Sequence, residues 1–301
     1  MRIATDTFSN SLLQQIQTLG TQESQYQQEL STGDQITNPS DDPAAMNQVL
    51  NMTSQLESLH QYSSNNAVAT QITQQSYSAL NNLQSISTSA SELATEGSSG
   101  LTSSTSYQAY SQQITQLINQ ALQTANSQYN GNYLFGGTNT TTPPFTATYD
   151  ASGNVTGVTY TGTAAGASME TGEGSVVSPY TDGTTNQQIA DFINNLVALG
   201  SAVSSQSATA IQAAQPALQT SEDNILSAVS GVDAVQSGLE ADQSLNQSAF
   251  TSLQGLISND TSTDVATTTV QLTQAQDSYQ AALEAGAKIM QTSLLNYLVF
   301  Q

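Results

Sequence analysis

The sequence is poor in several residue types that most catalytic and metal-binding proteins use. Its 301 residues include no cysteine, no tryptophan and a single histidine, His60. Without cysteine the chain can form neither disulfides, thiolate metal sites nor a cysteine nucleophile. Its many serines lack a base that could activate them, and His60 lies in a helical pattern with almost no cation or thiol to pair with. These absences argue against an enzyme.

Positive charge is almost missing as well. Only Arg2 and Lys288 are cationic, against 23 aspartates and glutamates, which gives a formal net charge of -21. Nucleic acids and anionic lipids are bound through cations, so the composition excludes both as partners. The sequence has no run of eighteen apolar residues, and we expect no membrane insertion. The first residues also lack the apolar core of a secretory signal peptide, so any export is expected to use another route.

The acidic residues are spread thinly and suggest structural roles. Asp41 and Asp42 precede Pro43 at a predicted helix start, where a capping carboxylate is the simplest interpretation. Residues 150–154 resemble the start of a calcium loop, but Val155 stands where such a loop has glycine, so a hairpin turn is favoured. We therefore predict no catalytic residue, no metal site and no cofactor.

What the sequence does contain is helical periodicity at both ends. A C-terminal stripe that begins at Val265 recurs at steps of three and four, and a similar N-terminal stripe is interrupted at Glu23. Neighbouring residues in the sequence cannot cover either stripe. We predict that the two terminal helices pair with each other and with further copies of the chain. The residues assigned to this assembly interface are Phe8, Leu12, Ile16, Leu19, Tyr26, Leu30, Leu272, Tyr279, Leu283, Met290, Leu294 and Leu298.

Start and stop signals bound these terminal helices. Ser9 or Asn10 is the predicted N-cap of the first helix, and Gly33 follows its expected end. Thr261 and Asp264 have the spacing of a capping box ahead of the last helix.

Further helical patterns occupy much of the interior. A long helix is predicted over 43–96, and a second one starts near Tyr107 and stops at residues 130–131, an Asn-Gly pair that tolerates the conformation of a helix end. Helical periodicity resumes over 186–200, and Pro216 is expected to break the following segment or to start the next helix.

The period changes between the second and third of these interior helices. Residues 139–183 are rich in Thr, Gly and Val, with alternation at Phe145, Ala147 and Tyr149 and a returning strand at 155–160. We therefore predict a mainly α fold, an elongated helical bundle or coiled-coil rod with a small β-rich insertion. The expected divisions are an N-terminal arm at 1–40, rod halves at 41–138 and 186–260, the insertion at 139–185, and a C-terminal arm at 261–301. Both arms are expected to be disordered before assembly because isolated helices are marginal.

Three stretches resemble the flagellin superfamily. LSTGDQITNPSDDPAAMNQVLNM at 30–52 resembles the segment that joins the N-terminal arm to the first core helix. NGNYLFGGTNTTTPPF at 130–145 and ALEAGAKIMQTSLLNYL at 282–298 are similar to the β-domain entry and the C-terminal ending of the hook-filament junction members. The stretches occur in matching order and spacing. One departure is Asp34, where relatives carry Lys or Arg, which puts their inter-subunit salt bridges in doubt here.

The resemblance implies a secreted structural subunit of the bacterial flagellum, exported unfolded through the type III apparatus. Its implied partners are the first hook-associated protein, flagellin, further copies of itself, and a cytosolic export chaperone on the C-terminal arm. It implies a need for the chain in filament attachment and motility, and neither an enzymatic activity nor a cofactor. Two alternatives stay open: a flagellin-like filament subunit, and an extracellular carbohydrate-binding module whose site would use Tyr149 and Tyr160 of the insertion.

Overall fold

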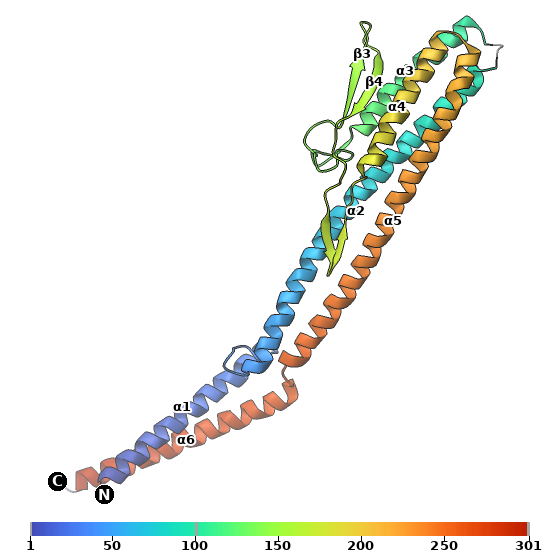
Figure 1. The fold of residues 1–301 in the computed structure, drawn as a ribbon. Helices are drawn as coiled ribbons and strands as arrows, with labels where there is room; N and C mark the ends of the chain where they lie inside the picture. Colours follow the sequence, from blue (N-terminus) through green and yellow to red (C-terminus); the bar gives the residue numbers. More distant parts are fainter. Residues whose placement is uncertain (1, 100–101, 300–301) are drawn as a thin grey trace. The chain divides into compact units, whose positions relative to one another are not determined.

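The computed structural model describes residues 2–99 and 102–299, and the side chains of 10–99 and 102–291. The described residues form six helices and six short strands (Figure 1). The helices are α1 (Arg2–Thr32), α2 (Pro43–Gly97), α3 (Ser104–Ala125), α4 (Gly183–Ser204), α5 (Ala208–Thr261) and α6 (Val265–Val299). The strands are β1 (Gln128–Tyr129), β2 (Asn132–Tyr133), β3 (Phe145–Tyr149), β4 (Val155–Tyr160), β5 (Met169–Gly172) and β6 (Ser175–Val177). The prediction of a mainly α fold with a small β-rich part is confirmed.

The chain forms two compact units. The smaller unit comprises residues 1–57 and 250–301, so it contains α1, α6 and the adjoining ends of α2 and α5. The larger unit comprises residues 58–249, with α3, α4, all six strands and the remainder of α2 and α5. The ends of the chain therefore meet in one unit, although they lie farthest apart in the sequence.

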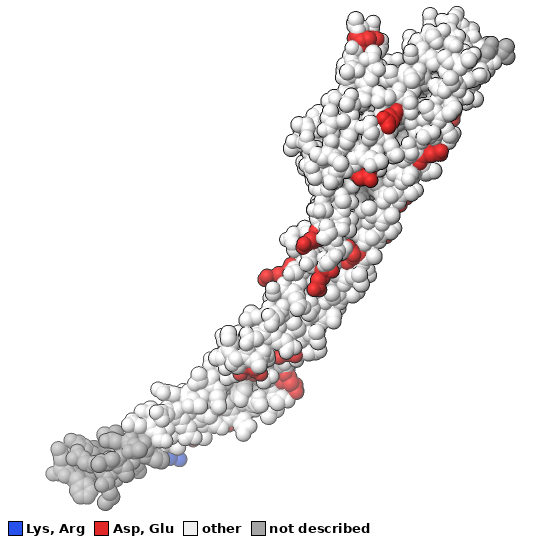
Figure 2. All heavy atoms as spheres, viewed as in Figure 1, with Lys and Arg blue, Asp and Glu red and all other residues white. Residues whose placement is uncertain are grey.

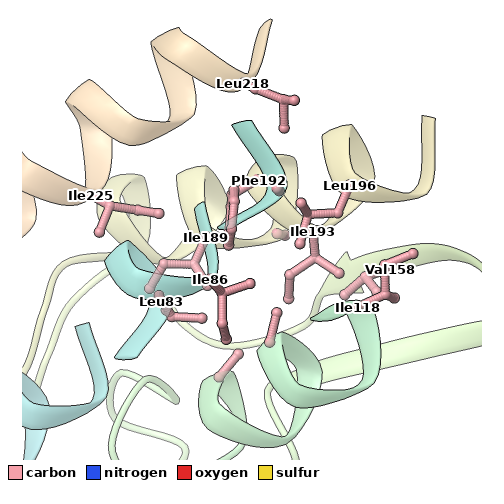
Figure 3. Packing of buried hydrophobic residues seen from close by; sticks show 14 of the residues in the cluster. Leu83, Ile86, Ile118, Val158, Ile189, Phe192, Ile193, Leu196, Leu218 and Ile225 are labelled. Atoms are coloured by element: carbon pink, nitrogen blue, oxygen red, sulfur yellow. The ribbon is translucent and has the colours of Figure 1, made fainter. Parts of the chain in front are cut away.

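A single apolar cluster holds the larger unit together (Figure 3). Helices α2 and α4 contribute the largest shares, and the apolar residues of α4 recur on one face, which neighbouring elements cover completely. The members labelled in Figure 3 are Leu83, Ile86, Ile118, Val158, Ile189, Phe192, Ile193, Leu196, Leu218 and Ile225. They come from α2, α3, α4, α5 and β4, so this core joins the helices to the β-rich part.

The strands form three separate antiparallel hairpins, of which β1–β2 precedes residue 139. The predicted hairpin over 145–160 is confirmed as β3–β4. Its two edges are covered by asparagine side chains in place of further strands. The Asn194 amide accepts from Val158 N (2.8 Å) and donates to Val158 O (2.9 Å), and Asn126 pairs with Phe145 in the same way (3.1 and 2.9 Å). Each amide thus bonds both the backbone N–H and the C=O of one strand residue, which could otherwise pair with another strand.

The acidic pair ahead of α2 has the predicted capping role. Asp42 Oδ1 accepts hydrogen bonds from the backbone amides of Ala44 (2.9 Å) and Ala45 (3.0 Å). Asp41 Oδ2 accepts from the amides of Asn38 (2.8 Å) and Thr37 (3.2 Å). The backbone bond from Asn38 is the main reason that the pKa of Asp41 lies below its usual value. Both carboxylates are thus occupied by backbone donors.

Two predicted helix boundaries are wrong, the end of α3 and the start of α1. Helix α3 ends at Ala125, and the Asn130-Gly131 pair forms the tight turn between β1 and β2. Both residues have positive φ, 50° and 81°, as a two-residue hairpin turn requires. Ser9 and Asn10 do not cap the first helix, since α1 already begins at Arg2.

Two predicted interruptions are also absent. Helix α4 continues through Gly200, where α3 approaches so closely that a Cβ would lie 3.3 Å from Ile114 Cγ2. Glycine therefore serves helix packing at this position. Pro216 lies inside α5 and is exposed, so the carbonyl that loses its helical partner can be hydrated. Buried Ile211 and Leu218 anchor the helix on either side of it.

The start of the last helix differs from the predicted capping box. Thr261 belongs to the last turn of α5, where its hydroxyl donates to Ile257 O (2.9 Å). Asp264 alone caps α6 by accepting from the Thr267 hydroxyl (2.8 Å) and from Ala266 N (3.0 Å). These bonds, the Thr267 hydroxyl first, hold the pKa of Asp264 below its usual value.

Candidate assembly surface of the terminal helices

The predicted pairing of the two terminal helices is confirmed. Helices α1 and α6 pack against each other in opposite directions (Figure 1). At one end the backbone joins them, with Thr263 N donating to Gly33 O (2.9 Å) and Gln35 N donating to Thr261 O (2.6 Å). Gly33 has φ 80°, which allows the chain to turn sharply at the end of α1.

Glycine lets the two helices approach at two points of this pair. A Cβ at Gly286 of α6 would lie 3.3 Å from Leu12 Cδ2 and 3.8 Å from Ile16 Cδ1. A Cβ at Gly20 of α1 would lie 3.5 Å from the Tyr279 ring. At both points, a glycine of one helix packs against large side chains of the other helix.

The contact faces follow the repeat of three and four residues expected for paired helices. On α1 the buried and half-buried residues are Leu12, Ile16, Leu19, Gly20, Glu23, Tyr26, Glu29 and Leu30. On α6 the buried and half-buried residues are Thr268, Leu272, Ala275, Tyr279, Ala282, Gly286 and Ile289. The face of α6 is therefore built largely from small residues, and the face of α1 from large ones.

The structure divides the predicted interface residues into three groups. Those of α1 from Leu12 to Leu30 lie on the contact face, together with Leu272 and Tyr279 of α6. Leu283 and Met290 lie outside it and are 45% and 67% exposed. The side chains of Phe8, Leu294 and Leu298 lie outside the described residues.

The predicted stripe of α6 therefore runs from the contact face onto the neighbouring side of the helix. Val265, which is 59% exposed, stands on that side with Leu283 and Met290, because whole helical turns separate the three. We call these three residues the α6 flank. The sequence reasoning missed the small contact residues, such as Ala275 and Gly286. The sequence could have indicated them, because Ala275 follows Leu272 by three residues and Gly286 follows Tyr279 by seven, which places them on the same helix face.

Neutral amides donate hydrogen bonds to carboxylates in this pair. Gln276 Nε2 of α6 donates to Glu23 Oε1 of α1 (3.4 Å), and Gln27 Nε2 donates to the same oxygen (3.1 Å). Glu29 is buried and accepts from Gln25 Nε2 (3.0 Å). Acidic side chains elsewhere are spread over the face shown in Figure 2. Glutamine thus takes positions at which a cation would otherwise face a carboxylate.

The described residues offer no cluster of side chains that could hold a metal ion. Within 2–99 and 102–299, no three His, Asp or Glu side chains lie together as metal ligands would. His60 is exposed on α2. In the same part of the chain, no helix has both the length and the apolar character needed to cross a membrane.

The two tyrosines considered for carbohydrate binding have different environments. Tyr149 is 59% exposed, but Tyr160 packs against Phe145, with ring centroids 5.4 Å apart. The Tyr160 hydroxyl donates to Thr163 O (2.9 Å) and accepts from Asn186 Nδ2 (3.1 Å), and burial raises its pKa. Tyr160 is half-buried, so less of its ring is open to a ligand than that of Tyr149.

Comparison with known families gives a match in the N-terminal part of this chain. Residues 3–140 match the family described as the bacterial flagellin N-terminal helical region. The match supports the resemblance to the flagellin superfamily seen in the sequence. A comparison with curated proteins found no match.

Solved structures narrow the fold to that of the flagellar hook-associated proteins. A protein assigned to that class from Vibrio parahaemolyticus has 17% identity and a TM-score of 0.65, with 74% of this chain and 100% of that chain covered. FlgL from Bacillus cereus has 18% identity and a TM-score of 0.59, with coverages of 69% and 99%. Flagellar hook-associated protein 3 from Legionella pneumophila has 13% identity and a TM-score of 0.56, with coverages of 69% and 97%.

Proposed function

We propose that this chain is a structural subunit that joins the flagellar hook to the flagellin filament. The observation that carries the proposal is the shared fold, which spans nearly the full length of three hook-associated proteins. The flagellin match over residues 3–140 supports the same placement, since a junction subunit must pack against flagellin. The chain would act without catalysis or a cofactor and would be required for filament attachment and motility.

Its proposed partners follow from this position. The first hook-associated protein would lie on the hook side, flagellin on the filament side, and further copies of the chain beside it. The protein would be exported unfolded, with a cytosolic chaperone on the C-terminal arm, and would reside outside the cell. A chain without cysteine suits this route because no disulfide has to be broken or re-formed.

The α1–α6 pair is the proposed assembly surface, and its two faces would have different roles. The contact face, with Leu12, Tyr279 and their neighbours, joins the two helices of one subunit. The α6 flank presents apolar side chains to solvent in the isolated chain. An exposed apolar surface gains free energy when a partner covers it. We assign the flank to contacts between subunits.

The division into arms and rod remains part of this proposal. Residues 1–40 and 261–301 would order fully only on assembly, around rod halves at 41–138 and 186–260 and an insertion at 139–185. Limited proteolysis of the purified monomer tests the arms. Rapid cleavage within the arms is expected, and resistance of both arms in the monomer would contradict coupled folding and assembly.

A deletion strain tests the function itself. If the chain is the junction subunit, the strain should form hooks, lack filaments and release flagellin into the medium, and the intact gene should restore attachment. Complete filaments on the deletion strain would refute the proposal. Loss of filaments without any released flagellin would favour the alternative of a filament subunit, because the missing chain would then be the filament material.

A further inference from the structure

The apolar cluster of the larger unit does not extend along the whole α2–α5 pair. It reaches Ile72 on α2 and Val232 on α5. Beyond these residues, within 58–249, the fully buried apolar side chains of the two helices are Ala69 and Leu239. Apolar burial is the main force that holds helices together. Because little of it occurs in this stretch, other contacts must keep the two helices aligned there.

Buried asparagines occupy this stretch. Asn66 of α2, 1% exposed, donates from Nδ2 to Leu239 O of α5 (2.8 Å). Asn246 of α5, 7% exposed, donates from Nδ2 to Thr171 O of β5 (2.6 Å). A buried amide without a partner is costly, so each asparagine stabilises one relative position of the segments that it joins.

The β5–β6 hairpin is bonded to both helices of this stretch (Figure 1). Asp242 Oδ2 of α5 accepts from the hydroxyls of Thr171 (2.6 Å) and Ser175 (2.7 Å), one from each strand. On the other side, Asn65 Nδ2 of α2 donates to Glu170 O (2.8 Å). Thr171 is fully buried, and its hydroxyl has the Asp242 carboxylate as its closest partner, with Ser175 Oγ at 3.3 Å.

We propose that the β5–β6 hairpin is a clasp that locks α2 and α5 in one register, with Asp242 as its central acceptor. Sliding one helix by a turn would unpair Asn66 and Asn246 and would move Asp242 away from both hydroxyls. A single buried asparagine fixes register in coiled coils by the same physical rule. The clasp is a property of the single chain and does not rest on the proposed place in the flagellum.

Spin labels can measure the register directly because the chain has no cysteine to interfere. Ser63→Cys and Gln243→Cys place labels on exposed positions of α2 and α5. In the otherwise unchanged chain, we expect one narrow distance distribution. Removing the acceptor by Asp242→Ala, or the two donors by Thr171→Val with Ser175→Ala, should broaden it or add a second distance.

Hydrogen exchange on the full chain supplies the second measurement. Both clasp variants should exchange about tenfold faster or more at 60–71 and 236–249, since charge-assisted hydrogen bonds are lost. Exchange within α4 should not change. The donor variant leaves both helices untouched, so it separates the clasp from any effect of alanine on α5. Asp233→Ala, at an exposed acidic position of the same helix, is the matched control. Unchanged distances, or faster exchange confined to the hairpin, would overturn the proposal.

Discussion

The α6 flank allows a quantitative test of assembly. Full burial of a leucine or methionine side chain contributes about 1.5–3 kcal/mol. Leu283 and Met290 are 45% and 67% exposed, so covering their exposed parts would contribute roughly 1 and 1.5 kcal/mol per subunit contact. Replacing both by serine should therefore weaken each contact by about 2.5 kcal/mol, or roughly 70-fold in the association constant.

Sedimentation of the purified chain over a range of concentrations measures this loss. The double variant Leu283→Ser with Met290→Ser should shift association to higher concentration while far-UV circular dichroism shows unchanged helix content. Leu226→Ser is the matched control, because this leucine is 50% exposed and lies on α5 in the larger unit. In the deletion strain, the control gene should restore filaments and the double variant should not.

Two results would refute the reasoning. If the double variant associates as tightly as the unchanged chain, the flank does not contact neighbouring subunits. If Leu226→Ser weakens association as strongly, the effect comes from general surface apolarity and the assignment to α6 fails. Tyr279→Ser adds a useful comparison, since Tyr279 packs against α1 at Gly20. Its loss should disturb the α1–α6 pair within one subunit as well as association.

Three further predictions concern the fold. Asn194→Leu leaves the buried N–H and C=O of Val158 without partners, so urea unfolding should show a loss of about 2–5 kcal/mol, whereas less than about 0.5 would contradict the strand-edge role. Phe192→Ala opens a cavity at a fully buried position and should cost about 3–5 kcal/mol in the same assay, against almost nothing for Leu226→Ser. Asp264 has a folded-state pKa below the 3.8 that is usual for aspartate, so its capping contribution is complete above pH 3.8 and is lost as pH falls through the folded-state pKa. The helicity of the α1–α6 pair, followed between pH 6 and 2, should lose this acid dependence in Asp264→Asn. The control Asp277→Asn should keep it. An unaltered pH profile in Asp264→Asn would exclude the capping role.

The sequence predicts large apolar contact residues better than small ones. The sequence predicts the large apolar residues of the α1 face between Leu12 and Leu30, because leucine, isoleucine and tyrosine mark them clearly, but it does not predict that Gly20 and Glu23 belong to the same face. The face of α6 is rotated from the predicted stripe toward Ala275 and Gly286. Small residues carry little hydrophobicity, although they allow the close approach that decides which side of the helix is buried. Periodicity of apolar residues alone therefore could not separate the contact face from the α6 flank.

Helix ends show a related limit. The capping role of Asp42 follows from its immediate neighbours, so it was predictable. Gly200 and Pro216 carry local stop signals, but packing from distant residues overrides both. The clasp around Asp242 was also beyond sequence reasoning, because its hydroxyl donors lie about 70 residues away along the chain. Contacts of this kind become visible only when the hairpin is placed on the helices.

The shortage of cations explains much of the polar chemistry of this chain. Carboxylates that would pair with lysine or arginine accept from glutamine one helical turn away, as in Gln25–Glu29 (3.0 Å) and Gln187–Asp191 (3.1 Å). A neutral amide satisfies a carboxylate but does not cancel its charge, so each subunit keeps its formal charge of -21. In the proposed assembly, neighbouring copies would have to associate against their mutual repulsion, which dissolved ions screen. Apolar surfaces such as the α6 flank could supply the attraction that overcomes it, because burial of apolar surface needs no opposite charge.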